Sequence, residues 1–518
     1  MLGVFGICSV TGRSAMHART IELTCILEPA ATDDGPRTDE VRRLFGLPRR
    51  EPPAILFERV ALRLAPGRLL YVTGPSGGGK STLMRRVAES LSDVIVVGCD
   101  PPPGDAALID WIAPGRPLAV AMRALAVCGL AEPRLWLRRV AELSAGEHAR
   151  AALARALAAA LARVPKPVVV CDGFAEGLHA RLAASLASNL RRLVTGLGLC
   201  VIVAGTRDEL VADLRPDEWV RLAGPGRSHR SESSAPPRRR PPLKLRVEPG
   251  GVRDYRELAA LHYRGDAPPG FVDRVFVARQ AGDDDVLAVV VYAMPPIELA
   301  LRNLATAGRF SGNPRRLNRE LRILRRLVVH PDVRGRGVGH WLVRRTLPLA
   351  GTRFVECLAA MGAVNPLFER AGMTRVGQVV PRGRLALLER LRRLRVDPFR
   401  DDFEQRVRDC PRVRRLVERT LLDWRRATTG RASSASESQV DAAAALRRLV
   451  SEPPVYYLWD RRGRYPLPVG DVRNASDQCG WIERCRPEST VERREPGNDR
   501  HDPRDGGPTQ RGPEGGLS

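Results

Sequence analysis

Between residues 54 and 225, short apolar runs alternate with longer stretches in which apolar residues recur every three or four positions. Runs such as RLLYVTG (68–74), KPVVVCD (166–172) and LGLCVIVAG (197–205) are rich in valine and leucine, which is typical of strands buried on both faces. Helix-like stretches such as GEHARAALARALAAALARV (146–164) lie between them. The alternation predicts an α/β domain in which helices cover a parallel sheet.

The rest of the chain changes pattern several times. A second alternation predicts an α+β domain, an Arg-rich helical pattern follows it, and PPVYYLW (453–459) is either a strand or a docking segment. Ser, Pro and Arg between the two domains predict a linker, and the polar end predicts disorder. The predicted regions are an N-terminal extension with one strand (1–53), the α/β domain (54–225), a basic Pro/Ser linker (226–243), the α+β domain (244–385), an Arg-rich helical region (386–470) and a disordered tail (471–518).

Length and composition narrow the class of protein. A chain of 518 residues exceeds one compact core, and 28% charged with 43% hydrophobic residues is typical of a soluble globular protein. No apolar run reaches the roughly 18–20 residues of a membrane helix, and the N-terminus lacks the pattern of a secretory signal. The ten cysteines form no C-x-x-C pair. We therefore expect a cytoplasmic protein without a membrane partner.

The net charge of +25 favours nucleic acid or another polyanion as a partner. The alternative is a compositional bias, because the only lysines are Lys80, Lys166 and Lys244. Such a bias explains the choice of arginine over lysine, but it does not explain the excess of basic over acidic residues. Both interpretations stay open at this point.

The segment GPSGGGKST satisfies G-x-x-x-x-G-K-[ST] and stands between a predicted strand and a predicted helix, which is the context that this motif needs. Its glycines let backbone N–H groups point at phosphate oxygens, and the helix N-terminus adds positive partial charge. Lys80 would reach the β- and γ-phosphates of ATP, while Ser81 and Asp172 would hold Mg²⁺. The candidate loop residues are Gly74, Pro75, Ser76, Gly77, Gly78, Gly79, Lys80, Ser81 and Thr82.

The segment LSAGEHARAALARAL begins at Leu143 and precedes the strand that leads to Asp172. It resembles the signature of the ABC ATPases, and the resemblance covers about residues 54–225. The resemblance implies that Ser144 and the amides around Gly146 contact the γ-phosphate of a nucleotide held by a second subunit. It also implies an ATP-dependent head-to-tail homodimer.

This domain departs from the ABC family where water is activated and the γ-phosphate is sensed. Gly173 stands where the family has a glutamate, and Glu176 would replace it only after a shift of the loop. His179 stands at an aspartate position, Thr206 at a histidine position, and no glutamine occurs in 97–112. Loss of a positioned base costs about 10²–10⁴ in rate. We therefore expect ATP to be bound but hydrolysed slowly or not at all.

A second Gly-rich turn lies in RRLVVHPDVRGRGVGHWLVRRTL (325–347), between a strand-like and a helix-like run, where helix amides suit a pyrophosphate. With RFVECLAAM (353–361) and NPLFERAGM (365–373) after it, the R-x-x-G-x-G spacing resembles motif A of the GNAT acyltransferases. A Rossmann-like or unrelated nucleotide site is the alternative. The resemblance covers about 245–385. It implies acetyl-CoA contacts at Val328, Val329, Arg334, Gly335, Arg336, Gly337, Val338, Gly339 and Asn365.

The GNAT resemblance further implies that backbone amides at the end of the strand polarise the acetyl carbonyl, and that a base takes the proton of an acceptor amine. Glu320 and Glu356 are the candidate catalytic bases, although Glu356 could equally be a structural carboxylate paired with an arginine. Phe368 stands where the family's general-acid tyrosine is expected. Asn365 could hydrogen-bond the pantetheine arm or cap a helix.

Two phosphate cradles on one chain predict an acetyl-CoA-dependent N-acetyltransferase whose degenerate, ATP-binding ABC domain gates or clamps the substrate. ATP, Mg²⁺ and acetyl-CoA are the expected cofactors. The architecture resembles a family in which an ABC-type ATPase is fused to a predicted acetyltransferase domain. The alternative is a nucleic-acid-binding ABC-type ATPase with a non-catalytic GNAT fold.

Overall fold

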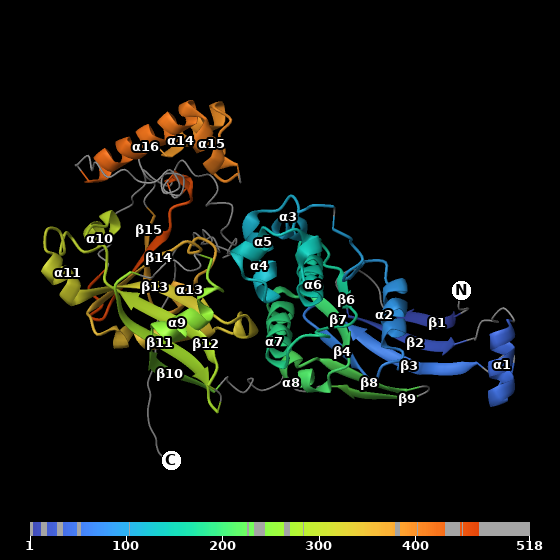
Figure 1. The fold of residues 1–518 in the computed structure, drawn as a ribbon. Helices are drawn as coiled ribbons and strands as arrows, with labels where there is room; N and C mark the ends of the chain where they lie inside the picture. Colours follow the sequence, from blue (N-terminus) through green and yellow to red (C-terminus); the bar gives the residue numbers. More distant parts are fainter. Residues whose placement is uncertain are drawn as a thin grey trace, which may run out of the picture. The chain divides into compact units, whose positions relative to one another are not determined.

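Figure 1 shows the fold of the chain in a computed structural model. The predicted tail (471–518) and the arginine run 238–240 lie outside the described residues. The described residues are 4–11, 18–27, 35–48, 53–102, 104–224, 227–232, 244–263, 270–282, 284–378, 384–400, 402–429, 446–447 and 449–465.

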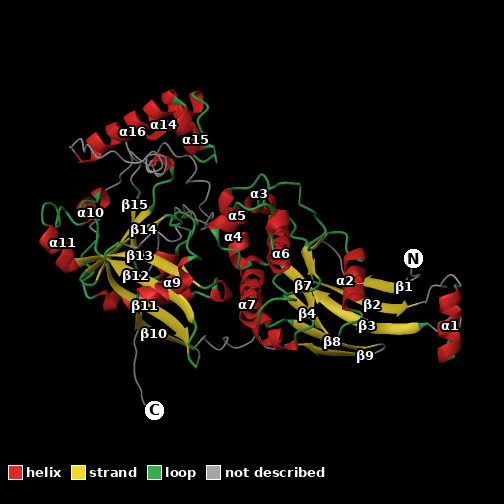
Figure 2. Ribbon diagram, in the orientation of Figure 1, coloured by secondary structure: helices red, strands yellow, loops and turns green. Residues whose placement is uncertain are grey.

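The first sheet confirms the predicted P-loop α/β architecture, and Figure 2 shows it with its covering helices. Its strands lie in the order β5-β6-β7-β4-β8-β9. Every neighbouring pair is parallel except β8 with β9. The strands are β4 (Leu69–Thr73), β5 (Val94–Val96), β6 (Val168–Cys171), β7 (Cys200–Gly205), β8 (Glu218–Gly224) and β9 (Arg227–Glu232). Strand β9 lies inside the predicted linker (226–243), so the sheet extends beyond the predicted boundary.

Helices bury both faces of this sheet because successive side chains of a strand point to opposite faces. Tyr71 and Val203 pack with most of the helices on one face, whereas Val72 and Ile202 pack with α2 on the other. The helices are α2 (Lys80–Glu89), α3 (Leu108–Ile112), α4 (Leu118–Val127), α5 (Pro133–Trp136), α6 (Ala145–Leu161), α7 (Ala180–Leu197) and α8 (Val211–Leu214).

The N-terminal extension is part of the first domain, which corrects the predicted boundary after residue 53. Strands β1 (Val4–Thr11), β2 (Arg19–Leu27) and β3 (Ala54–Leu64) form an antiparallel sheet across that boundary. Ile21 of β2 lies in the same apolar cluster as Leu83 of α2. Helix α1 (Pro36–Phe45) also lies in this extension, for which the sequence predicted only one strand.

The second sheet has the order β10-β11-β12-β13-β14-β16-β15, in which only β13 and β14 are parallel neighbours. Their pairing runs from Leu321 with Phe354 to Leu324 with Cys357 and stops there, although both strands continue. A gap therefore opens in the middle of the sheet. The strands are β10 (Leu245–Gly250), β11 (Val272–Gln280), β12 (Val286–Ala293), β13 (Leu321–Val329), β14 (Phe354–Ala359), β15 (Thr374–Gly377) and β16 (Val455–Asp460).

Helices cover this sheet on both faces as well. Leu258 packs against one face with Val289, and Leu342 packs against the other with Val290. The helices before β15 are α9 (Val252–Ala259), α10 (Ala300–Ala305), α11 (Pro314–Glu320), α12 (Val338–Thr346) and α13 (Leu367–Arg370).

The predicted boundary at residue 385 separates β16 from the sheet to which it belongs. Strand β16 includes most of PPVYYLW and inserts between β14 and β15. Helices α14 (Arg384–Arg393), α15 (Phe403–Asp409) and α16 (Pro411–Thr429) lie between β15 and β16 in the chain and share a separate apolar cluster. The Arg-rich helices are therefore an insertion between the last two strands of the sheet.

A buried ion pair fastens α10 to the centre of this sheet. Arg302 donates to both carboxylate oxygens of Glu356 at 2.9 and 2.7 Å, and both side chains are 0% exposed. The hydroxyl of Tyr456 donates to the same carboxylate, because burial and the Glu356 charge hold the pKa of Tyr456 well above its ordinary value. The carbonyls of Pro296 and Ile297 accept two further N–H groups of Arg302. Both charges of the pair are therefore hydrogen-bonded within the protein.

We predict that Glu356→Gln lowers the free energy of unfolding by about 3–5 kcal/mol, because it leaves the Arg302 cation buried without a counter-charge. Urea unfolding followed by tryptophan fluorescence measures the change. Glu298→Gln, at an exposed carboxylate of the same region, is the matched control and should change it by less than about 0.5 kcal/mol. Equal stability of the two variants would contradict a structural role for the buried pair.

Candidate functional site

The phosphate loop connects β4 to α2, and its backbone fits a nucleotide phosphate. Gly74 has φ +149°, and a Cβ there would lie 2.2 Å from the carbonyl oxygen of Leu222, so only glycine fits. Gly79 begins α2 with φ +90°. Lys80 is 8% exposed and donates to the carbonyls of Gly74 and Pro75 at 2.9 and 2.7 Å. The loop therefore curls around an ammonium group beside the unpaired N–H groups of a helix N-terminus.

Strand register brings Asp172 to the same edge of the sheet as this loop. Cys171 pairs with Val203, and Val203 pairs with Tyr71 of β4. Because the three strands are parallel, Asp172 leaves the sheet at the level where β4 approaches the loop. Its side chain is exposed, and one carboxylate oxygen accepts the N–H of Gly173 at 3.0 Å. Carboxylate and hydroxyl oxygens are ligands that Mg²⁺ prefers, so Asp172 and Ser81 fit that ion.

The signature residues have a local structural role. Ser144 caps α6: its hydroxyl accepts the N–H of Glu147 at 3.3 Å and donates to the Glu147 carboxylate at 2.8 Å. A Cβ at Gly146 would lie 3.0 Å from a methyl group of Leu178, so glycine lets α6 approach the loop that follows β6. Contact of Ser144 and Gly146 with the nucleotide of a second subunit stays a prediction.

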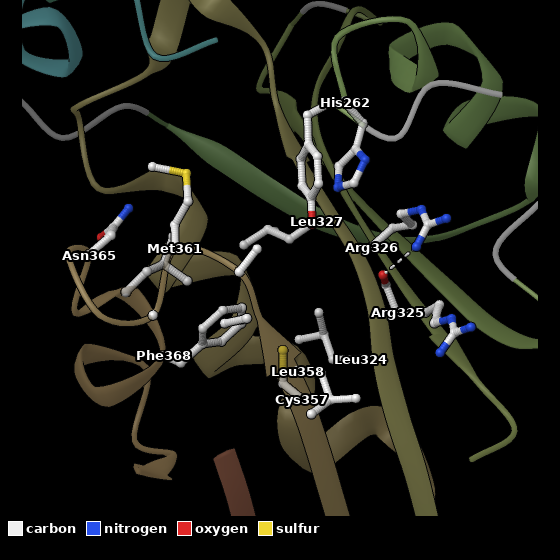
Figure 3. A pocket seen from close by; sticks show the side chains of 15 residues that line it. His262, Leu324, Arg325, Arg326, Leu327, Cys357, Leu358, Met361, Asn365 and Phe368 are labelled. Carbon is white, nitrogen blue, oxygen red and sulfur yellow. Dashed lines mark hydrogen bonds between the residues drawn. The ribbon is translucent and has the colours of Figure 1, made fainter. Parts of the chain in front are cut away.

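A cavity of about 180 Å³ opens where β13 and β14 separate. The residues from Leu324 to Leu327 line it on β13, and Cys357 lines it on β14. Figure 3 shows Phe368 and Asn365 across the cavity from the β13 residues. Burial, reinforced by the neighbouring Glu356 carboxylate, raises the pKa of Cys357, so this group remains a thiol.

The second Gly-rich turn precedes α12 as predicted, with Gly335 at φ +77° and Gly337 at φ +84°. The ring of His340 packs over Gly337, where an added Cβ would lie 2.7 Å from Cε1. Burial and the positive charge of Arg370 lower the pKa of His340, so its ring is neutral at pH 7. The turn thus presents helix N–H groups beside a neutral imidazole.

Residues of the first domain contact this turn. Asn189 of α7 donates to the carbonyl of Arg334 at 3.2 Å, and Arg192 donates to that of Gly335. The guanidinium of Arg334 pairs with Glu132 at 2.6 Å and is 10% exposed. The sequence predicted that Arg334 binds a pyrophosphate. In the structure its guanidinium group is paired with the Glu132 carboxylate.

Neither predicted base lies among the residues that line the cavity. Glu356 is paired with Arg302 in the buried ion pair described above. Glu320 pairs with Arg309 at 2.7 Å and Arg316 at 3.3 Å. Burial alone raises the pKa of Glu320, but the two guanidinium groups outweigh it and hold the pKa below its usual range. Neither carboxylate is therefore placed to take a proton from a group in the cavity, which argues against the predicted role of both.

The other predicted contacts lie at the cavity or just beyond it. Asn365 lines the cavity, and its N–H donates to Met361 at 2.9 Å. Val328 and Val329 follow Leu327, the last cavity-lining residue of β13, and pair with β12. Val328 and Val329 therefore lie beside the cavity but are not among the residues that line it.

Sequence reasoning missed two polar aromatic residues that line the cavity, His262 and Tyr263. Their ring centroids are 4.6 Å apart, directly after α9. The signal was a His-Tyr pair at the end of the predicted helix VRDYRELAALHY, but only the three-dimensional structure shows that this helix ends at the gap.

Within the described residues, no helix combines the length and the apolar composition that spanning a lipid bilayer requires. Among the same residues, no group of three or more His, Cys, Asp and Glu side chains forms a potential metal site.

Comparisons with known proteins match the first domain. A family model described as an AAA domain matches residues 64–212. The zinc import ATP-binding protein ZnuC of Alcanivorax borkumensis is 32% identical over 183 residues, which are 32% of this chain and 67% of that protein.

Two solved structures are also similar in this domain. The dimeric ATP-binding cassette MJ0796, in a post-hydrolysis state with ADP and Pi, is 18% identical with a TM-score of 0.30, covering 36% of this chain and 94% of that one. An inward-facing ABC transporter of the metal-chelate type is 20% identical with a TM-score of 0.29, covering 35% and 77%.

The phosphate loop and Asp172 meet at one edge of a parallel sheet, and the ZnuC relative is matched over two thirds of its length. Through its first domain, this chain belongs to the P-loop ATPases of the ABC type.

Proposed function

We propose that this chain is an acetyl-CoA-dependent N-acetyltransferase of the cytoplasm whose ABC domain binds ATP, forms a homodimer and gates acyl transfer. The observation that carries the proposal is the cavity between β13 and β14, on a chain that also holds a phosphate loop. The gap supports binding of an acyl thioester because strands that part leave N–H groups free to donate to a carbonyl. This is the feature expected from the GNAT resemblance.

The cavity residues suggest how the amine would lose its proton. With Glu320 and Glu356 paired elsewhere, His262 and Tyr263 are the titratable groups of the cavity that suit proton transfer. Phe368 lines the cavity in place of a tyrosine, so Tyr263 is also the candidate donor to the departing CoA thiolate. Acetyl-CoA supplies the activated acyl group, and the chain orients it.

Helix α7 supports coupling between the two sites. It begins at the end of the loop that follows Asp172, and three of its side chains donate to the turn before α12: Ser185 to Asp332, Asn189 to Arg334 and Arg192 to Gly335. A movement of the loop on ATP binding would therefore change the contacts of the turn proposed to bind pyrophosphate. Because Gly173 replaces the usual glutamate, we expect this change to reverse slowly.

A second candidate is a nucleic-acid-binding ABC protein with a non-catalytic second domain. Exposed arginines on the α14–α16 insertion favour it: Arg390, Arg392, Arg393, Arg408, Arg412, Arg415 and Arg419. Binding of RNA or DNA that weakens steeply with salt, without any acetyl transfer, distinguishes this candidate from the first.

We predict that Lys80→Ala weakens ATP binding about 100-fold or more and abolishes ATP-dependent dimerisation, because the loop loses the cation that it surrounds. Titration with a fluorescent ATP analogue and analytical ultracentrifugation measure both effects. Lys166→Ala, at the exposed lysine that donates to Leu197, is the control and should leave both unchanged. Tight ATP binding by Lys80→Ala would contradict the assignment of the loop.

We predict that Leu358→Trp weakens acetyl-CoA binding tenfold or more, because the larger side chain fills the cavity that Leu358 lines. Isothermal titration calorimetry measures the affinity. Leu349→Trp is the matched control, because Leu349 is also a half-exposed leucine of this domain but does not line the cavity. Equal affinities of the two variants, or no binding by the unmodified chain, would refute the proposed acyl-CoA site.

We predict that ATP changes the affinity for acetyl-CoA at least fivefold, and that Arg192→Ala reduces this factor to below twofold. Arg192 is not itself a predicted ligand contact, but it donates to Gly335 of the turn proposed to bind pyrophosphate. The exposed Arg163, replaced by alanine, is the control. Unchanged coupling in Arg192→Ala would show that α7 does not connect the sites.

A further inference from the structure

The loop after β6 brings Glu176 close to position 173, where the loop lacks a glutamate. Gly173 follows Asp172, so the chain has no side chain at the position where this family carries its water-activating glutamate. Gly173 adopts φ +66° and Ala175 adopts φ +59°, both in the left-handed region. The N–H of Glu176 donates to the carbonyl of Gly173 at 3.2 Å. These features close a tight turn that folds Glu176 back onto Gly173.

The turn brings the Glu176 carboxylate to the space that a side chain at 173 would enter. A Cβ built on Gly173 would lie 3.5 Å from Oε2 of Glu176 and 3.8 Å from its Cδ. The sequence suggested that Glu176 could serve only after a shift of the loop. The structure removes that objection, because the glycine permits the turn that makes the approach.

The surrounding structure holds this loop in place. The N–H of Phe174 donates to the carbonyl of Ala204 on β7 at 2.7 Å, and the Phe174 side chain is 2% exposed. At the other end, Arg207 donates to the carbonyl of Leu178 at 2.7 Å. Glu176 itself is exposed, and within the described residues no hydrogen bond or ion pair engages its carboxylate. Its charge is therefore available at the edge of the sheet.

The register of the sheet places the loop that carries Glu176 near the phosphate loop. Cys171, Val203 and Tyr71 lie level on three adjacent strands, so Gly173 lies about level with Thr73, at the entrance to the phosphate loop. With strands about 4.8 Å apart, β6 and β4 are separated by roughly 10 Å, which is a span that a nucleotide phosphate and a water molecule can bridge.

We propose that Glu176 is the catalytic base of ATP hydrolysis in this chain, in place of the residue missing at 173. Glu176 accepts a proton from a water molecule as the water oxygen forms a bond to the γ-phosphorus. The bond from that phosphorus to the bridging oxygen breaks, and ADP leaves with the electron pair. The proposal rests on ATP binding by the ABC domain and not on the acetyltransferase activity.

The test is single-turnover ATP hydrolysis by the full chain, with the ATP affinity and the lifetime of the ATP-bound dimer measured in parallel. Glu176→Gln keeps the size of the side chain but removes the base. Glu209→Gln is the matched control, because Glu209 is exposed and follows β7 at the same edge of the sheet.

We expect Glu176→Gln to slow hydrolysis about 100-fold, with ATP affinity within twofold of the unmodified chain and a longer-lived ATP-bound dimer. The control should hydrolyse ATP normally. Equal rates for Glu176→Gln and the unmodified chain would overturn the proposal, and so would an unmodified chain that binds ATP without hydrolysing it. Failure of the unmodified chain to bind ATP would instead overturn the ATP-binding function itself, which the affinity measurement reveals separately.

Discussion

The parallel register of β6, β7 and β4 is the constraint on which the nucleotide site depends. The phosphate loop, Asp172 and the Glu176 turn leave the sheet at one edge only because these strands are paired level with one another. Glycines at Gly74 and Gly79 let the backbone take positive φ angles there, and Lys80 occupies the space that they enclose. Gly173 extends this arrangement, because its left-handed φ belongs to the turn that folds the Glu176 carboxylate back towards position 173.

Arginine governs which carboxylates remain available for chemistry. The chain has 84 Lys and Arg against 59 Asp and Glu residues, and three of the carboxylates described above have a guanidinium partner. Glu356 is held by Arg302, Glu320 by Arg309, and Glu132 by Arg334. Glu176 differs because, within the described residues, no arginine forms an ion pair with its carboxylate. An arginine also connects α7 to the turn before α12, because Arg192 donates to the carbonyl of Gly335.

Much of the first domain could be predicted because its motifs are local: the phosphate loop and the strand before Asp172 each lie within a few residues. The position of β16 could not, because the α14–α16 insertion separates it from the strands that it joins. The partner of Glu356 could not be identified for a similar reason, since Arg302 lies in a different part of the chain. The approach of Glu176 to Gly173 could not be predicted either, because it depends on the positive φ angles of Gly173 and Ala175.

The central claim is that one chain transfers an acetyl group under the control of ATP. The most direct test incubates the protein with labelled acetyl-CoA and an extract of its source cells, with and without ATP, and separates RNA, protein and small molecules. For the unmodified chain, we expect label in one fraction, in an amount that changes with ATP. For Lys80→Ala, we expect ATP to leave the amount of label unchanged. No label in any fraction, from protein that binds both ligands, would contradict it.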